Sequence, residues 1–171
     1  MGYFYIDREK EYKDTLKLIS KIESSDWVDE NLVIVVCSPE YSSMVCQLIN
    51  HKLSHLNDNK PFEMEFLEMP YPNGETLSKG EYGYLCEQLS EKYRHSDKKL
   101  LLVDSGCLRG SNFTTLKNQL VGSVSNFRFG CLYLQSGSIF EPDFCVEEFD
   151  FESDGGLLFW WENENNPYWE W

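Results

Sequence analysis

Residues 100–113, LLLVDSGCLRGSNF, are typical of a strand that leads through a short turn into a helix. The strand is expected to end at Asp104 and the helix to begin at Ser111. A carboxylate at a strand end can accept hydrogen bonds from a sugar diol, and the turn Gly110-Ser111-Asn112 can present the N–H groups of a helix N-terminus to a phosphate. The Ser111 hydroxyl would either join that phosphate site or cap the helix. An ordinary strand–turn–helix connection explains the same residues.

Outward from this stretch, the chain alternates helical and extended patterns. Helices are predicted over residues 7–22, 41–56, 82–93 and 111–120. Strands are predicted over residues 32–37, 62–69, 100–104, 127–134 and 157–161, and a loop over residues 70–80, which hold two prolines and two glycines. This order predicts a three-layer α/β fold with a mostly parallel central sheet and helices on both faces. Because ligands bind at the carboxyl ends of such strands, residues 38–42 and 104–112 are expected at the same edge.

Length and apolar content predict one domain, residues 1–171, with an N-terminal helical part at 1–30 and a C-terminal segment at 140–171. The apolar runs are too short to span a bilayer. The first residues, MGYFYIDREKEYKD, lack a basic segment followed by an apolar one. A cytoplasmic location is therefore expected.

Acidic residues outnumber basic ones by 29 to 15, which gives a net charge of −14. This balance argues against direct binding to a nucleic-acid backbone, which requires a basic face. It leaves a solvated surface, or a surface that imitates nucleic acid or pairs with a basic partner. The six cysteines form no Cys-x-x-Cys pair, and His51 and His55 have no third ligand in the pattern, so no direct metal ligand is predicted.

Residues 100–113 resemble the phosphoribosyl pyrophosphate signature of type I phosphoribosyltransferases. In that signature a hydrophobic strand precedes two acidic residues, two or three apolar ones and Thr-Gly-x-Thr. Asp104 falls on the first acidic position, and Arg109-Gly110-Ser111-Asn112 falls on the Thr-Gly-x-Thr loop. The Arg-Gly pairing is similar to the version in amidophosphoribosyltransferases.

Two further regions resemble the family in the same order. Residues 16–56 resemble its opening, from a helix through the turn Ser25-Asp26-Trp27 and a strand to the pyrophosphate loop and the next helix. Leu132-Tyr133-Leu134, Pro142-Asp143-Phe144 and Leu158-Phe159-Trp160-Trp161-Glu162 resemble the close of bacterial and archaeal xanthine- and guanine-type enzymes. The resemblance thus covers nearly the whole chain and implies the fold of these purine phosphoribosyltransferases.

The resemblance also implies a nucleotide-binding site and a glycosyltransferase reaction of purine salvage. In that reaction 5-phosphoribosyl passes from phosphoribosyl pyrophosphate, bound with Mg²⁺, to a nucleobase. Asp104 would be the catalytic residue that holds the ribose hydroxyls, beside Ser105. The implied 5′-phosphate site is Arg109, Gly110, Ser111 and Asn112; the implied pyrophosphate loop is Ser38, Pro39, Glu40, Tyr41 and Ser42; the implied base pocket contains Trp161 and Glu162.

The chain departs from the family pattern in four places. Ser105 replaces the second acid, and Leu108 replaces the Asp that handles the base proton in 6-oxopurine enzymes. Trp160 replaces the proline of the family's Phe-Pro-Trp-Glu strand. In the pyrophosphate loop, Pro39 has no N–H and Glu40 repels an anion, where relatives have Arg-Gly-Gly.

Three functions remain open from the sequence. The first is an active phosphoribosyltransferase. The second is a catalytically silent regulator of the same fold that binds phosphoribosyl pyrophosphate or a nucleoside monophosphate. The third is an acidic interaction or inhibitor protein. Tyr168, Trp169 and Trp171 lie among acidic residues and predict a contact with a protein partner or a second copy of the chain, and no membrane partner is expected.

Overall fold

The computed structural model describes residues 3–67, 79–154 and 156–160. The elements follow in the order β1 (Tyr3–Ile6), α1 (Arg8–Glu23), β2 (Leu32–Val36), α2 (Pro39–Leu53), the 3₁₀ helix η1 (Ser54–Asn57), β3 (Glu63–Phe66), α3 (Lys79–Lys92), β4 (Lys99–Cys107), α4 (Ser111–Leu120), β5 (Phe127–Gln135), β6 (Phe144–Phe149), α5 (Phe151–Asp154) and β7 (Gly156–Phe159). Within the described ranges, no helix is both long enough and apolar enough to cross a membrane.

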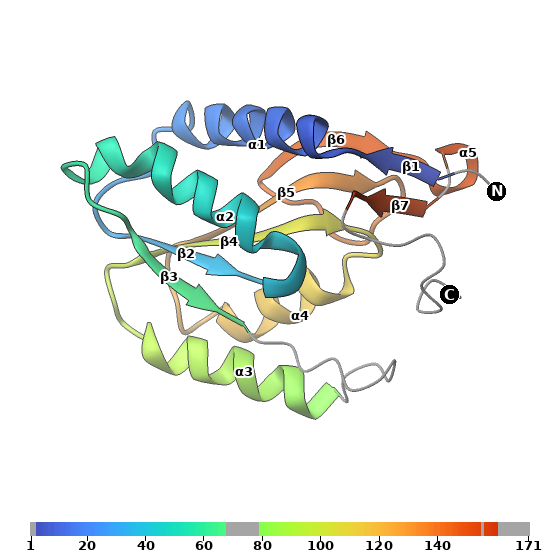
Figure 1. Ribbon diagram of the computed structural model, residues 1–171. Coiled ribbons are helices and arrows are strands. Elements are labelled where there is room, and N and C mark those ends of the chain that lie inside the picture. Colours follow the sequence, from blue (N-terminus) through green and yellow to red (C-terminus); the bar gives the residue numbers. More distant parts are fainter. Residues whose placement is uncertain (1–2, 68–78, 155, 161–171) are drawn as a thin grey trace.

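Five strands form one parallel sheet in the order β3–β2–β4–β5–β6 (Figure 1). β4 is central, and its register places Val103 opposite Val36 of β2 and Asp104 opposite Cys131 of β5. The carboxyl ends of all five strands therefore lie at one edge. β1 and β7 form a separate two-stranded parallel ribbon, in which Ile6 pairs with Phe159.

The central strands are buried on both faces, as their continuous apolar runs require. All residues of β2 are buried, and so are Leu100, Leu101, Leu102 and Val103 of β4. Alternate β4 side chains point to opposite faces. Leu101 packs in the core that α1 and α2 cover, and Leu102 packs in the core that α3 and α4 cover. Figure 1 shows the two helix layers on either side of the sheet.

The predicted three-layer α/β fold with a parallel sheet is confirmed. The prediction that the strand ends at Asp104 is wrong, because β5 continues to pair with β4 as far as Cys107. α2 begins at Pro39, two residues earlier than expected, since the fixed φ of proline suits the first position of a helix and its missing N–H is not needed there.

Three elements were not predicted, namely β1, β6 and α5. Most of the loop predicted at residues 70–80 falls outside the described residues. Its last two positions belong to α3, which begins at Lys79 rather than at residue 82. The assignment of residues 1–171 to a single domain stays a prediction.

Candidate phosphate and ribose site

The Asp104 carboxyl group lies inside the carboxyl edge of the sheet and is hydrogen-bonded by its own chain. The Ser38 hydroxyl donates to Oδ2 at 2.6 Å, and the Ser105 N–H donates to Oδ1 at 2.7 Å. The side chain is buried, with only 9% of the Asp104 surface exposed. Burial raises its pKa from 3.8 to about 6, against the opposing effect of hydrogen bonds from Ser38 and from the backbone of Ser105 and Gly106.

The structure therefore brings Ser38 and Asp104 together, as predicted from the sequence. Unexpectedly, the Ser38 hydroxyl donates to the Asp104 carboxylate itself. A carboxylate that binds a ribose diol must present its oxygens to the ligand. Both oxygens of Asp104 already accept hydrogen bonds from the protein. Ser105, at the second acidic position of the family pattern, is 1% exposed and likewise lies below the surface.

The turn at residues 38–42 is closed by its own hydrogen bonds. The Ser42 hydroxyl donates to the Ser38 carbonyl at 2.8 Å and accepts from the Ser38 N–H at 3.3 Å. The Ser42 N–H also donates to that carbonyl, at 2.8 Å. Ser42 is completely buried, and Pro39 has no N–H to offer. Ser42 of the predicted pyrophosphate loop thus bonds within the loop and the Ser38 hydroxyl bonds to Asp104, while the side chains of Glu40 and Tyr41 lie outside the described part of the structure.

The turn before α4 is held in place by a neighbouring loop. Gly110 is the N-cap residue of α4 with φ +80°, and no side chain caps this helix. A Cβ at Gly110 would lie 2.6 Å from Phe140 Cβ and 2.6 Å from Ser138 Oγ. The Arg109 carbonyl accepts from the Ile139 N–H at 3.1 Å. Glycine is therefore required here for its left-handed conformation and for close contact with residues 138–140.

Three predicted phosphate-binding residues lie at the surface of this turn. Arg109, Ser111 and Asn112 are exposed at the N-terminus of α4, whereas Gly110 is buried. Ser111 is the first residue of the helix rather than its cap, so the expected capping role is wrong. No carboxylate of the described residues lies within ion-pair distance of Arg109. Its guanidinium is therefore available to an anion at the positive end of a helix.

The contact that residues 138–140 make with Gly110 was not predicted. Ser136-Gly137-Ser138 indicates a turn after β5, and Gly137 does adopt a φ of +81°. Only the packed structure shows that this turn touches Gly110, because the contact joins loops almost thirty residues apart in sequence.

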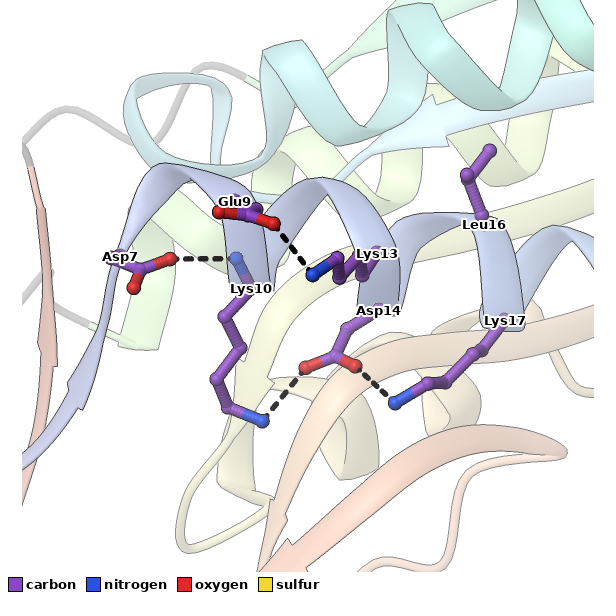
Figure 2. Close-up of a pocket in the computed structure, with 7 residues that line it drawn as sticks. All are labelled: Asp7, Glu9, Lys10, Lys13, Asp14, Leu16 and Lys17. Atoms are coloured by element: carbon purple, nitrogen blue, oxygen red, sulfur yellow. Dashed lines mark hydrogen bonds and ion pairs between the residues drawn. The ribbon is translucent and has the colours of Figure 1, made fainter.

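A separate cavity of about 500 Å³ lies along the first half of α1 (Figure 2). It is lined by Asp7, Glu9, Lys10, Lys13, Asp14, Leu16 and Lys17, and none of these is a predicted site residue. Figure 2 shows ion pairs along the helix, Lys13 with Glu9 at 2.6 Å and Asp14 with Lys10 at 3.0 Å and with Lys17 at 2.7 Å; Lys10 also pairs with Glu147 of β6. The cavity is therefore not part of the site at the sheet edge.

The predicted base-pocket residues Trp161 and Glu162 lie outside the described residues. Trp160, just before them, is fixed against α1. Its indole N–H donates to Glu11 Oε2 at 2.8 Å, and the Arg8 guanidinium lies 5.6 Å from its ring centroid. Glu11 is 1% exposed, and its Oε1 has no hydrogen-bond partner among the described residues. Burial raises the Glu11 pKa from 4.5 to about 7, although the bond from Trp160 opposes the shift.

Comparisons with known proteins place this architecture among phosphoribosyltransferase folds. No family model and no curated protein matches the sequence. The structure is similar to a purine phosphoribosyltransferase from Pyrococcus horikoshii Ot3, with a TM-score of 0.62 and 13% identity over 95% of this chain and 96% of that chain. It is also similar to the xanthine-guanine-hypoxanthine phosphoribosyltransferase of Helicobacter pylori, with a TM-score of 0.59 and 15% identity over 94% and 92% of the two chains.

A hypoxanthine phosphoribosyltransferase from Staphylococcus aureus is similar as well, with a TM-score of 0.52 and 14% identity over 80% of this chain and 74% of that one. The chain therefore has a type I phosphoribosyltransferase fold. At these identities the likeness shows the fold alone, since one fold hosts many functions.

Proposed function

We propose that this chain is a catalytically silent protein of phosphoribosyltransferase fold that binds the 5′-phosphate of a nucleoside monophosphate. The observation that carries the proposal is the hydrogen bond from the Ser38 hydroxyl to Asp104. It joins one oxygen of the carboxylate, at the position that the family pattern assigns to the ribose hydroxyls, to the protein itself. Transfer of a phosphoribosyl group depends on electrostatic positioning of the ribose and the leaving group, and here the ribose acid is engaged with the protein.

The leaving-group side of the site supports the same proposal. Pyrophosphate carries several negative charges and requires cations or open N–H groups. The Ser38 N–H is bonded to the Ser42 hydroxyl, the Ser42 N–H is bonded to the Ser38 carbonyl, and Pro39 has none. Ser38, Pro39 and Ser42 therefore offer no free N–H group to pyrophosphate.

The residues present do not fit the Mg²⁺ that phosphoribosyl pyrophosphate brings with it. Asp104 is the acid that the pattern offers to this complex, and its oxygens are bonded to Ser38 and to the backbone. Within the described ranges, no group of three or more His, Cys, Asp or Glu side chains is arranged to hold a metal ion. Binding of the monophosphate is therefore proposed to be independent of Mg²⁺.

The phosphate half of the site supports binding without turnover. Arg109 is an exposed arginine at the N-terminus of α4 and is unpaired by any described carboxylate. Its turn is fixed by Gly110 against residues 138–140. An exposed guanidinium together with the first N–H groups of a helix is suited to a phosphate monoester.

Calorimetric titration with AMP and GMP, with and without a chelator, tests the proposal. We expect saturable binding that does not change when Mg²⁺ is removed, and a loss of at least about ten-fold in affinity for Arg109→Ala, in line with the value of a charge-assisted hydrogen bond. Arg94→Ala is the matched control, because Arg94 is an exposed arginine before the amino end of β4, and it should bind as the wild type does.

A second experiment addresses turnover. The protein is incubated with phosphoribosyl pyrophosphate, Mg²⁺ and each of adenine, guanine, hypoxanthine and xanthine, and pyrophosphate is measured. We expect no release above that of the Asp104→Asn variant. Release that depends on Asp104 would instead identify an active phosphoribosyltransferase. Absence of binding to any monophosphate would overturn the binding proposal.

A further inference from the structure

Two cysteines on neighbouring strands face each other in register. Cys131 of β5 is the direct partner of Cys145 of β6, and both side chains lie on the face covered by α3 and α4. Adjacent strands are about 4.8 Å apart, which falls within the Cα–Cα range of disulfides, about 4.4–6.8 Å. The electrostatic effect of the neighbouring Cys131 thiol favours the charged form of Cys145.

The surroundings of the two thiols differ in a way that divides their roles. Cys131 is completely buried, whereas Cys145 is partly exposed on β6, an edge strand of the sheet. The Lys21 ammonium group, on α1, donates to the backbone carbonyl of Cys145 at 2.6 Å. The neighbouring Cys131 thiol, the backbone at Glu147 and the charge of Lys21 lower the Cys145 pKa, against the opposing effects of burial and of the Glu148 charge. A thiol that is reachable and more easily ionised is the one that an oxidant attacks.

The other four cysteines lack this combination. Cys37, Cys46, Cys86 and Cys107 are buried, and burial raises the pKa of each thiol. Cys107, the nearest in character, interacts with the Ser138 hydroxyl at 3.6 Å. Buried thiols with raised pKa values react slowly with oxidants.

We propose that Cys131 and Cys145 form a reversible disulfide across β5 and β6 when the protein meets a peroxide. The Cys145 thiolate sulfur attacks one oxygen of hydrogen peroxide, the O–O bond breaks, and the departing hydroxide takes a proton to become water. Cys145 is then a sulfenic acid. The Cys131 sulfur loses its proton and attacks the Cys145 sulfur, and the displaced hydroxide takes that proton to become a second water. The two thiols lose two electrons in total, and one peroxide is reduced to two water molecules.

The position of the pair makes this bond compatible with the native fold. β6 pairs only with β5 within the described sheet, so it can adjust to the bond without disturbing a second neighbour. The bond closes a short loop that includes residues 136–140, the turn that supports Gly110. The disulfide does not depend on nucleotide binding, so its test is separate from that of the proposed function.

Mass spectrometry of the wild-type chain tests the disulfide directly. The native protein is treated with a small excess of hydrogen peroxide, remaining thiols are alkylated, and the chain is cleaved on the amino side of aspartates, which cuts between the two cysteines before Asp143. We expect two of the six cysteines to escape alkylation and the peptides with Cys131 and Cys145 to remain joined until a dithiol reductant separates them. Full alkylation after peroxide treatment, or a bond between any other pair, would overturn the proposal.

Variants separate the two roles. In Cys131→Ser, oxidised Cys145 has no second thiol with which to form a disulfide. Cys145 should therefore accumulate as a sulfenic acid that dimedone traps. In Cys145→Ser peroxide consumption by the native protein should fall about ten-fold, because only buried thiols remain. Cys86→Ser, a buried cysteine of α3, is the control and should form the bond at the wild-type rate. Sulfenic acid on Cys131 rather than on Cys145 would contradict the assigned order.

Discussion

Ser38 follows the end of β2 and Asp104 lies in the neighbouring strand β4, and their hydrogen bond is the smallest unit on which the proposed function rests. The hydroxyl donor favours the ionised carboxylate, while burial favours the neutral one. Because the folded pKa of about 6 exceeds the ordinary value of 3.8, folding stability falls as the pH rises from about 3.8 to about 6. Ser38 reduces this loss.

Ser38→Ala should therefore destabilise the protein more at pH 8 than at pH 5. At pH 8 Asp104 is ionised, and loss of a hydrogen bond to a charged group costs about 1.5–3 kcal/mol. At pH 5 the carboxyl group is mostly neutral and the loss is smaller. Urea unfolding at the two pH values measures the difference, and Ser20→Ala, an exposed hydroxyl bonded to the Leu16 carbonyl, is the control. Equal losses at both pH values would contradict the assignment.

Glu11 is a second buried carboxyl group with a raised pKa. Unlike Asp104, it has an oxygen, Oε1, that is buried without a partner among the described residues. Its folded pKa of about 7 exceeds 4.5, so stability falls as the pH rises from about 4.5 to about 7 and then levels off. Glu11→Gln removes the buried charge and keeps an acceptor for Trp160. We expect it to raise the unfolding free energy by about 2 kcal/mol at pH 8 and by much less at pH 5.

Denaturation of Glu11→Gln beside Glu9→Gln checks this expectation. Glu9 is exposed and pairs with Lys13 on the surface of α1, so its variant should change stability little at either pH. A Glu11→Gln variant that is less stable than the wild type at pH 8 would show that the ionised carboxylate is favoured in the fold.

At the scale of elements, the turn between β4 and α4 depends on one glycine. Gly110→Ala introduces a Cβ at a φ of +80° and within 2.6–2.8 Å of Ser138 and Phe140. Gly122 has a similar φ of +87° with no atom within 4 Å. Gly122→Ala should cost about 1 kcal/mol for backbone strain alone, and Gly110→Ala at least about 2 kcal/mol more for the displaced loop. Chemical denaturation of both variants measures this difference. Equal losses of unfolding free energy would show that residues 138–140 can move away from the added Cβ without cost.

The same elements show what local sequence can predict. β2, β4 and α4 were predicted because apolar runs and helical spacing are local properties, and the rule for parallel strands predicted that residues 38 and 104 share an edge. β1 was missed because a four-residue strand without a nearby partner has no distinct pattern, and its partner is β7. The closure of the turn by Ser42 and the contact of Gly110 with Ser138 depend on packed neighbours, which no local pattern encodes.

At the scale of the whole molecule, the β1–β7 ribbon lies against the end of the central sheet. Leu157 of β7 lies close to Gly106 of β4. A Cβ added at Gly106 would be 3.3 Å from Leu157 Cδ1. The ribbon has only two strands of four residues, whereas β4 has a strand on each side and helices on both faces. Short two-stranded units open more readily than the centre of a sheet.

Hydrogen exchange should therefore divide the molecule into two levels of protection. We expect the amides of β1 and β7 to exchange at least about ten-fold faster than those of Leu100–Val103, because the ribbon can open without disrupting the five-stranded sheet. Mass spectrometry of peptides from the native protein measures both regions in one experiment. Equal protection would show that the ribbon and the sheet unfold as one unit.

The pairing of β1 with β7 also affects how the protein is made. Residues 3–6 are synthesised about 150 residues before their partners at 156–159. At roughly 5–20 residues per second, the first strand waits for about ten seconds or more before it can pair. During that time the five-stranded sheet, whose strands all precede β7, can form first. The ribbon is therefore expected to form after the strands that precede β7, and the segment Tyr3–Ile6 is expected to stay unpaired, and open to chaperones and proteases, until residues 156–159 have been made.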